Sequence, residues 1–60
     1  MSEAERAELL RLQRVALARM RLMAEYTPSR ALSLAITKAE EAVHWLQDPS
    51  ILAPVNESNV

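Results

Sequence analysis

The sequence predicts an all-α fold, an antiparallel two-helix hairpin that assembles into a helical oligomer. The chain of 60 residues contains no Gly, and no Pro occurs before position 28. Apolar residues recur at steps of three and four in both halves, which is the helical period. A short break at residues 26–29, with Pro28 inside it, separates the two halves. Because so short a connection folds the second helix back onto the first, we expect a hairpin.

The first helix is expected to begin at residue 3, because Ser2 and Glu5 have the spacing of a capping box. Its main apolar stripe is Leu9, Leu12, Ala16, Met20 and Met23. A second set of apolar residues widens this stripe: Leu10, Val15, Leu17 and Leu22. The stripe is wider than one neighbouring helix covers, so we expect this helix to be buried on two sides.

The second helix is expected over residues 28–46, PSRALSLAITKAEEAVHWL, reaching about Gln47 before Asp48 and Pro49 end it. Pro28 suits the first helical position, so Thr27 is the expected cap, with Ser29 as the alternative. Six residues form the expected core stripe: Leu32, Ala35, Ile36, Ala39, Val43 and Leu46. A second apolar row consists of Ala31, Leu34, Ala42 and Trp45.

The organisation is therefore a helical hairpin domain over residues 1–48 and an irregular C-terminal tail over residues 49–60. In the tail, Ile51, Leu52 and Val55 either dock onto the helices or a neighbouring subunit, or the tail is disordered. A chain this small buries little of its surface alone, and without Cys no disulfide stabilises it. Small scaffolds of this kind need very good packing or self-association, so we expect an oligomer.

Several function classes are disfavoured by composition. A net charge of −1 argues against DNA binding, and no apolar run is long enough to span a membrane. The acidic first residues are unlike a secretory signal, which leaves the cytosol as the default location. His44 is the single His, Ser33 lies too far along the helix to reach it, and Glu41 with His44 makes only two ligands. We therefore expect no catalytic site, no metal site and no cofactor.

Polar side chains at helical spacing favour ligand binding. Ser33, Thr37 and Glu41 are four apart and share one face, and Lys38 adds an ammonium group beside them. On the first helix, Arg14 and Arg21 share one face, and Arg11 lies near it. If the two faces converge across a subunit boundary, the groups suit phosphate oxygens. The alternative for Thr37 is a hydroxyl bonded back to the carbonyl of Ser33.

The second helix resembles the signature helix of phage helical-hairpin sponge proteins, the anti-CBASS and anti-Thoeris hairpin domains. The matching residues are Ser29-Arg30, Leu32-Ser33-Leu34-Ala35, Thr37-Lys38, Glu40-Glu41-Ala42 and Trp45. The resemblance implies a non-enzymatic protein of the host cell cytoplasm that sequesters cyclic di- or trinucleotides, or cyclic ADP-ribose variants. It also implies a homo-hexamer, a trimer of dimers, with pockets between subunits. Arg30, Thr37 and Lys38 are the site residues it favours, with Arg14 or Arg11 contributed by the first helix.

A second interpretation remains open from the residues alone. A small helical protein-protein interaction module, or adaptor, would use its Arg residues at the rim of an interface. Trp45 would then be the anchor that fills a pocket on the partner.

Overall fold

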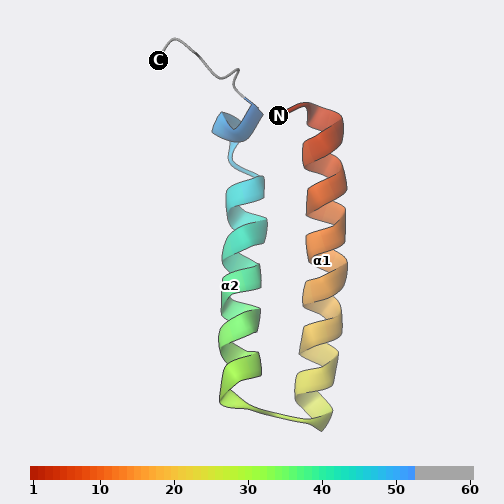
Figure 1. The fold of residues 1–60 in the computed structure, drawn as a ribbon, viewed down its shortest axis with the longest axis vertical. Coiled ribbons are helices and arrows are strands. Elements are labelled where there is room, and N and C mark those ends of the chain that lie inside the picture. The colour runs from red at the N-terminus through yellow and green to blue at the C-terminus, as the bar shows by residue number, and fades with distance from the viewer. Residues whose placement is uncertain (53–60) are drawn as a thin grey trace.

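The computed structural model describes residues 1–52 as two α-helices and a short 3-10 helix. Helix α1 spans Glu3–Tyr26, α2 spans Arg30–Leu46 and η1 spans Pro49–Leu52. The two α-helices run side by side in opposite directions, and the N-terminus lies beside η1 (Figure 1). The expected all-helical hairpin is therefore confirmed, while its assembly into an oligomer stays a prediction.

Helix α1 begins where the capping box was predicted. The Ser2 hydroxyl accepts a hydrogen bond from the Glu5 backbone N–H at 3.0 Å, and Glu5 Oε1 accepts one from the Ser2 N–H at 2.9 Å. The hydrogen bond from the Ser2 backbone stabilises the charged carboxylate and lowers the pKa of Glu5. Both exchanged bonds satisfy N–H groups that have no partner within the helix.

The turn between the helices corrects the predicted start of the second helix. Ser29, not Thr27, is the N-cap: its hydroxyl accepts the Leu32 backbone N–H at 2.9 Å, so α2 begins at Arg30 rather than at residue 28. Thr27 closes α1 instead, because its N–H donates to the Met23 carbonyl at 2.8 Å. Pro28 lies before the cap, where its ring keeps Thr27 out of the helical region.

The contact between the helices is a narrow seam with heptad spacing. Its most buried side chains are Leu10, Leu17 and Ala39, with exposed fractions of 8%, 6% and 5%. The half-buried seam residues are Arg6, Gln13, Met20 and Ala24 on α1, and Leu32, Ile36, Val43 and Leu46 on α2. Steps of three and four residues keep both rows facing the neighbouring helix.

The structure differs from the predicted core on both helices. On α1, Leu9, Leu12, Ala16 and Met23 are exposed, and the row displaced by one residue, which contains Leu10 and Leu17, forms the seam. On α2, five of the six predicted core residues lie in the seam, but Ala35 is exposed. A hairpin supplies one neighbour for each helix, so only one of the two adjacent apolar rows on α1 is covered.

The start of the predicted irregular tail is ordered as η1, which packs against α1. Asp48 initiates this turn, since its Oδ1 accepts the Ser50 N–H at 2.9 Å. That hydrogen bond lowers the pKa of Asp48. Ile51 and Leu52 are half-buried, whereas Val55, the third expected docking residue, lies outside the described residues.

Candidate functional site

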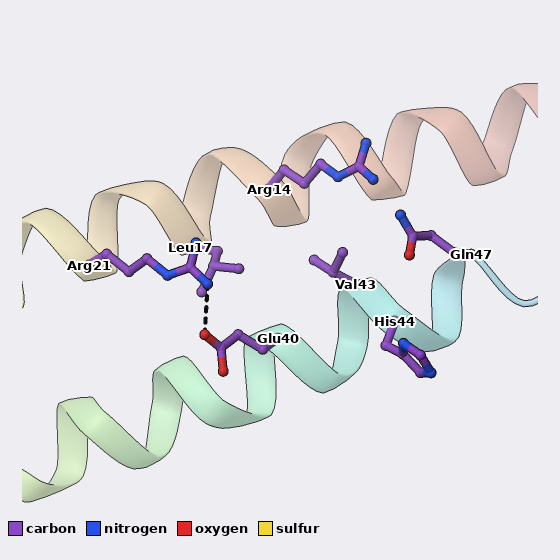
Figure 2. A pocket seen from close by; sticks show the side chains of 7 residues that line it. All are labelled: Arg14, Leu17, Arg21, Glu40, Val43, His44 and Gln47. Atoms are coloured by element: carbon purple, nitrogen blue, oxygen red, sulfur yellow. Dashed lines mark hydrogen bonds and ion pairs between the residues drawn. The ribbon is translucent and has the colours of Figure 1, made fainter.

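A shallow groove runs between α1 and α2 along one side of the hairpin, with a volume of about 470 Å³. Figure 2 shows the side chains that line it: Arg14, Leu17, Arg21, Glu40, Val43, His44 and Gln47. Buried Leu17 and half-buried Val43 supply apolar surface between the helices. The remaining lining residues are polar, so the groove combines an apolar base with guanidinium, carboxylate, imidazole and amide groups.

The position of the groove follows from the seam. Its polar residues Arg14, Arg21, Glu40, His44 and Gln47 each directly follow a seam residue in the sequence. One residue along an α-helix is a rotation of about 100°, so the residue after each seam position lies on the same flank of the contact. The two flanks meet because the helices are antiparallel, and the polar side chains of both helices then face one groove.

The two guanidinium groups of the groove differ in their partners. Arg21 Nη2 donates to Glu40 Oε2 at 2.7 Å across the helices, and both side chains are about half exposed. Within the described range 1–52, the Arg14 guanidinium forms no hydrogen bond or ion pair, unlike those of Arg6, Arg11 and Arg21. The groove therefore holds one neutralised cation and one cation whose donors are free to bind an anion.

The other predicted site residues do not line this groove, although Arg11, Ser33 and Thr37 also follow seam residues and so lie on the same flank of the hairpin. Arg11 pairs with Glu8 at 3.5 Å on the exposed side of α1. Lys38 pairs with Glu41 at 3.7 Å on exposed α2 surface. The Thr37 hydroxyl donates to the Ser33 carbonyl at 3.2 Å, which confirms the back-bonded alternative for this residue.

A single chain consequently brings two arginines of the predicted face, Arg14 and Arg21, into the groove, but none of the predicted α2 residues. Arg30 is the exposed first residue of α2, and neither it nor Thr37 or Lys38 lines the groove. A single chain therefore shows no pocket that Arg14 shares with these α2 residues. Their shared site stays a prediction.

Sequence reasoning did not place Gln47 beside the arginines, although it lines the same groove. Of the adjacent carboxylates Glu40 and Glu41, the structure pairs Glu40 with Arg21. The signal was the spacing of residues 40, 44 and 47, which repeats at steps of four and three on one flank of α2. That signal identifies a flank, but the pairing depends on the register between the helices.

A second, smaller hollow lies near the N-terminus of α1, with a volume of about 380 Å³ and a lining of Met1, Glu5, Glu8 and Leu9. Within residues 1–52, no three His, Cys, Asp or Glu side chains gather as metal ligands. In the same range, no helix is both long enough and apolar enough to cross a bilayer.

No protein-family model, curated protein or solved structure matches this chain. The similarity to the sponge proteins stays a prediction that rests on residues 29–45.

Proposed function

We propose that this chain is a non-catalytic binding protein that sequesters a phosphate-bearing cyclic oligonucleotide in the host cell cytoplasm. The observation that carries the proposal is the groove with the unpaired Arg14 guanidinium and Arg21 beside it. Guanidinium groups bind phosphate oxygens through two parallel hydrogen bonds, and apolar surface beside them accommodates a base or sugar. The residue pattern of α2 favours cyclic di- or trinucleotides, or cyclic ADP-ribose variants, as ligands.

The lining of the groove favours binding over catalysis. Within one chain its lining contains no Ser, Thr, Cys or Lys that would act as a nucleophile, and its one carboxylate is paired with Arg21. Thr37, which the proposed assembly adds, donates its hydroxyl proton to the Ser33 carbonyl rather than to a base. In the proposed assembly, a homo-hexamer built as a trimer of dimers, Arg30, Thr37 and Lys38 of one copy complete the pocket around Arg14 of another. Ser33, Glu41 and Arg11 would supply its outer contacts.

The test is native mass spectrometry of the chain incubated with a mixed panel of cyclic di- and trinucleotides and cyclic ADP-ribose variants. We expect one ligand to bind with micromolar or tighter affinity and to be recovered intact after denaturation. Failure of every ligand to bind would refute the proposal, and a cleaved ligand would refute its non-catalytic part.

Three substitutions locate the pocket. Arg14→Ala alone should weaken binding about tenfold or more, as expected for the loss of a charge-assisted contact to phosphate. If α2 of another copy completes the pocket, Arg30→Ala and Thr37→Ala should each abolish binding. Neither substitution should change the oligomer. Leu22→Gln, on exposed surface of α1 away from the groove, is the control and should bind like the unaltered chain.

A second candidate function is an interaction module that binds another protein. The observation that favours it is Trp45, which is 65% exposed on α2. Buried Trp side chains dominate many protein interfaces. Under this function, Trp45→Ala abolishes partner binding, whereas Arg14→Ala changes mainly the association rate.

A further inference from the structure

The side of the hairpin opposite the groove carries an exposed apolar face. It consists of Leu9, Leu12, Ala16 and Met23 on α1, and Ala31, Leu34, Ala35, Ala42 and Trp45 on α2. Except for Leu34, each of these residues directly precedes a seam residue, whereas the polar residues of the groove directly follow one. Because the residues that follow the seam share one side of the hairpin, those that precede it share the other.

The apolar face repeats with its own heptad spacing on each helix. On α1 the row is Glu5, Leu9, Leu12, Ala16, Arg19 and Met23, all exposed. On α2 the row is Ala31, Ala35, Lys38, Ala42 and Trp45, of which only Ala42 is half-buried. A row at this spacing is typical of a helix that packs against a further helix, and the alanines allow close approach.

The size of the face also indicates that something covers it. Leu9, Leu12, Met23, Leu34 and Trp45 are each between 42% and 65% exposed. Large apolar side chains that are exposed together on one side of a small protein mark an interaction surface. The hairpin itself has no fully buried large side chain to stabilise it alone.

We propose that the apolar face binds a second copy of this chain, with α1 antiparallel to α1 of the partner, forming a four-helix dimer. This deepens the self-association in the proposed function, and it rests on the helix faces rather than on ligand binding.

The charges on α1 favour this arrangement over the other symmetric one. If α1 packed against α2 of the partner about an axis parallel to the helices, Arg19 would meet Lys38 of the other copy. The two residues lie at similar distances from the turn, so like charges would oppose each other. If α1 packs antiparallel against α1 with Leu12 opposite Ala16, Arg19 of each copy lies within about one helical turn of Glu5 and Glu8 of the other. Glu8 also pairs with Arg11 of its own helix.

The second hollow lies on α1 at the residues that Arg19 of the other copy would contact. Glu5, Glu8 and Leu9 line it at the N-terminal end of the face. Arg19 forms no ion pair within residues 1–52, so its guanidinium is free for a carboxylate of the partner. The hollow offers Leu9 to the aliphatic stem of Arg19 and carboxylates to its charged end. In the same register, Glu5 of one copy lies opposite Met23 of the other, and Leu12 opposite Ala16.

Association of the full chain is measured by sedimentation equilibrium together with Trp45 fluorescence. We expect a dimer, or a larger assembly with an even number of copies, and a red shift of the Trp45 emission on dilution as the ring becomes hydrated. Leu12→Glu should shift the assembly toward smaller species by at least tenfold in the dissociation constant. Leu22→Glu is the matched control, because Leu22 has nearly the same exposure as Leu12, 45% against 48%, but lies off the face.

Orientation is tested by cysteine cross-linking, because the natural chain has no Cys. Glu5 and Met23 are about 27 Å apart along one helix, too far for a disulfide within a chain. A mixture of the Glu5→Cys and Met23→Cys variants should form a cross-linked heterodimer, while each variant alone should not form a homodimer. Glu5→Cys mixed with Leu22→Cys is the control and should remain unlinked.

Three results would overturn the interface. They are a monomer at the highest soluble concentration, homodimer cross-links in the single variants, and binding of the monomer to phospholipid vesicles through Leu12. A monomer that still binds a cyclic nucleotide would refute the interface and keep the binding function. A cross-linked dimer that binds no nucleotide would support the interface and refute the binding function.

Discussion

Arg6 donates a hydrogen bond from Nη1 to the backbone carbonyl of Leu46 at 3.2 Å and so joins the first turn of α1 to the last turn of α2. Its Nη2 simultaneously pairs with Glu3 Oε2 at 2.7 Å, which holds the guanidinium in place. That pairing raises the pKa of Arg6 and lowers the pKa of Glu3. Because the last carbonyls of a helix lack partners within it, a cation at this end of α2 is favourable.

Replacing Arg6 should loosen the open end of the hairpin. We expect Arg6→Ala to lower the melting temperature by about 5 °C, the shift that loss of one hydrogen bond causes in a domain of this size. Arg11→Ala is the control, because its partner Glu8 is on the same helix and both side chains are exposed. Circular dichroism during heating provides the measurement. Equal shifts for the two variants would mean that the bond to Leu46 contributes nothing.

Stability should fall in acid. The pKa values of Glu3, Glu5 and Asp48 are lowered in the folded chain by their hydrogen bonds. Their contribution is present above the carboxylate pKa of the unfolded chain and is lost as pH falls through the lower folded values. We therefore expect the midpoint of urea unfolding to decrease as pH falls from about 5 to about 2.

A substitution at Glu5 tests the source of this acid sensitivity. Glu5→Gln keeps a side-chain acceptor for the Ser2 N–H but does not titrate, so its midpoint should change less over the same pH range. A midpoint that stays constant in the unaltered chain, or that rises in acid, would contradict the assignment.

Leu17 should be among the most sensitive positions. It is 6% exposed, and Leu→Ala at such a site costs about 2–5 kcal/mol. Since a whole domain of this size is stabilised by only about 5 kcal/mol, Leu17→Ala should remove much of that stability and lower the helix content on mild heating. Leu22→Ala removes the same atoms from an exposed site and should stay folded. The far-ultraviolet circular dichroism of the two variants distinguishes these outcomes, and equal helicity would show that the seam is misassigned.

Glu40 should restrain the affinity of the groove for anions. Glu40→Gln removes the carboxylate that neutralises Arg21, so both guanidinium groups become available to phosphate. We expect a several-fold tighter dissociation constant for the nucleotide found by mass spectrometry, measured by titration calorimetry at low salt. Stability should change by less than about 1 kcal/mol, because the pair is solvent-exposed. Weaker binding in this variant would indicate that Glu40 itself contacts the ligand.

Local patterns were sufficient for the elements but not for all their ends. The capping box predicts the start of α1 because Ser2 and Glu5 interact only with neighbouring backbone groups. The start of α2 was predicted less well, since both Thr27 and Ser29 have hydroxyls that cap helices. For the site, the sequence indicated that Arg14 and Arg21 share a face, but the groove also needed residues of α2 brought beside them.

The sequence by itself determined two helices, a break at Pro28 and two adjacent apolar rows on α1, because these depend on interactions within a few residues. Only the tertiary structure decided which row is buried. Rows that begin at Leu9 and Leu10 differ by one residue, about 100° of rotation, and both are apolar enough to face a neighbour. Packing against Ala39 and its row selects Leu10 and Leu17 for the seam. With Leu10 and Leu17 in the seam, Arg14 and Arg21 line the groove. Leu9, Leu12 and Trp45 then remain exposed on the opposite side.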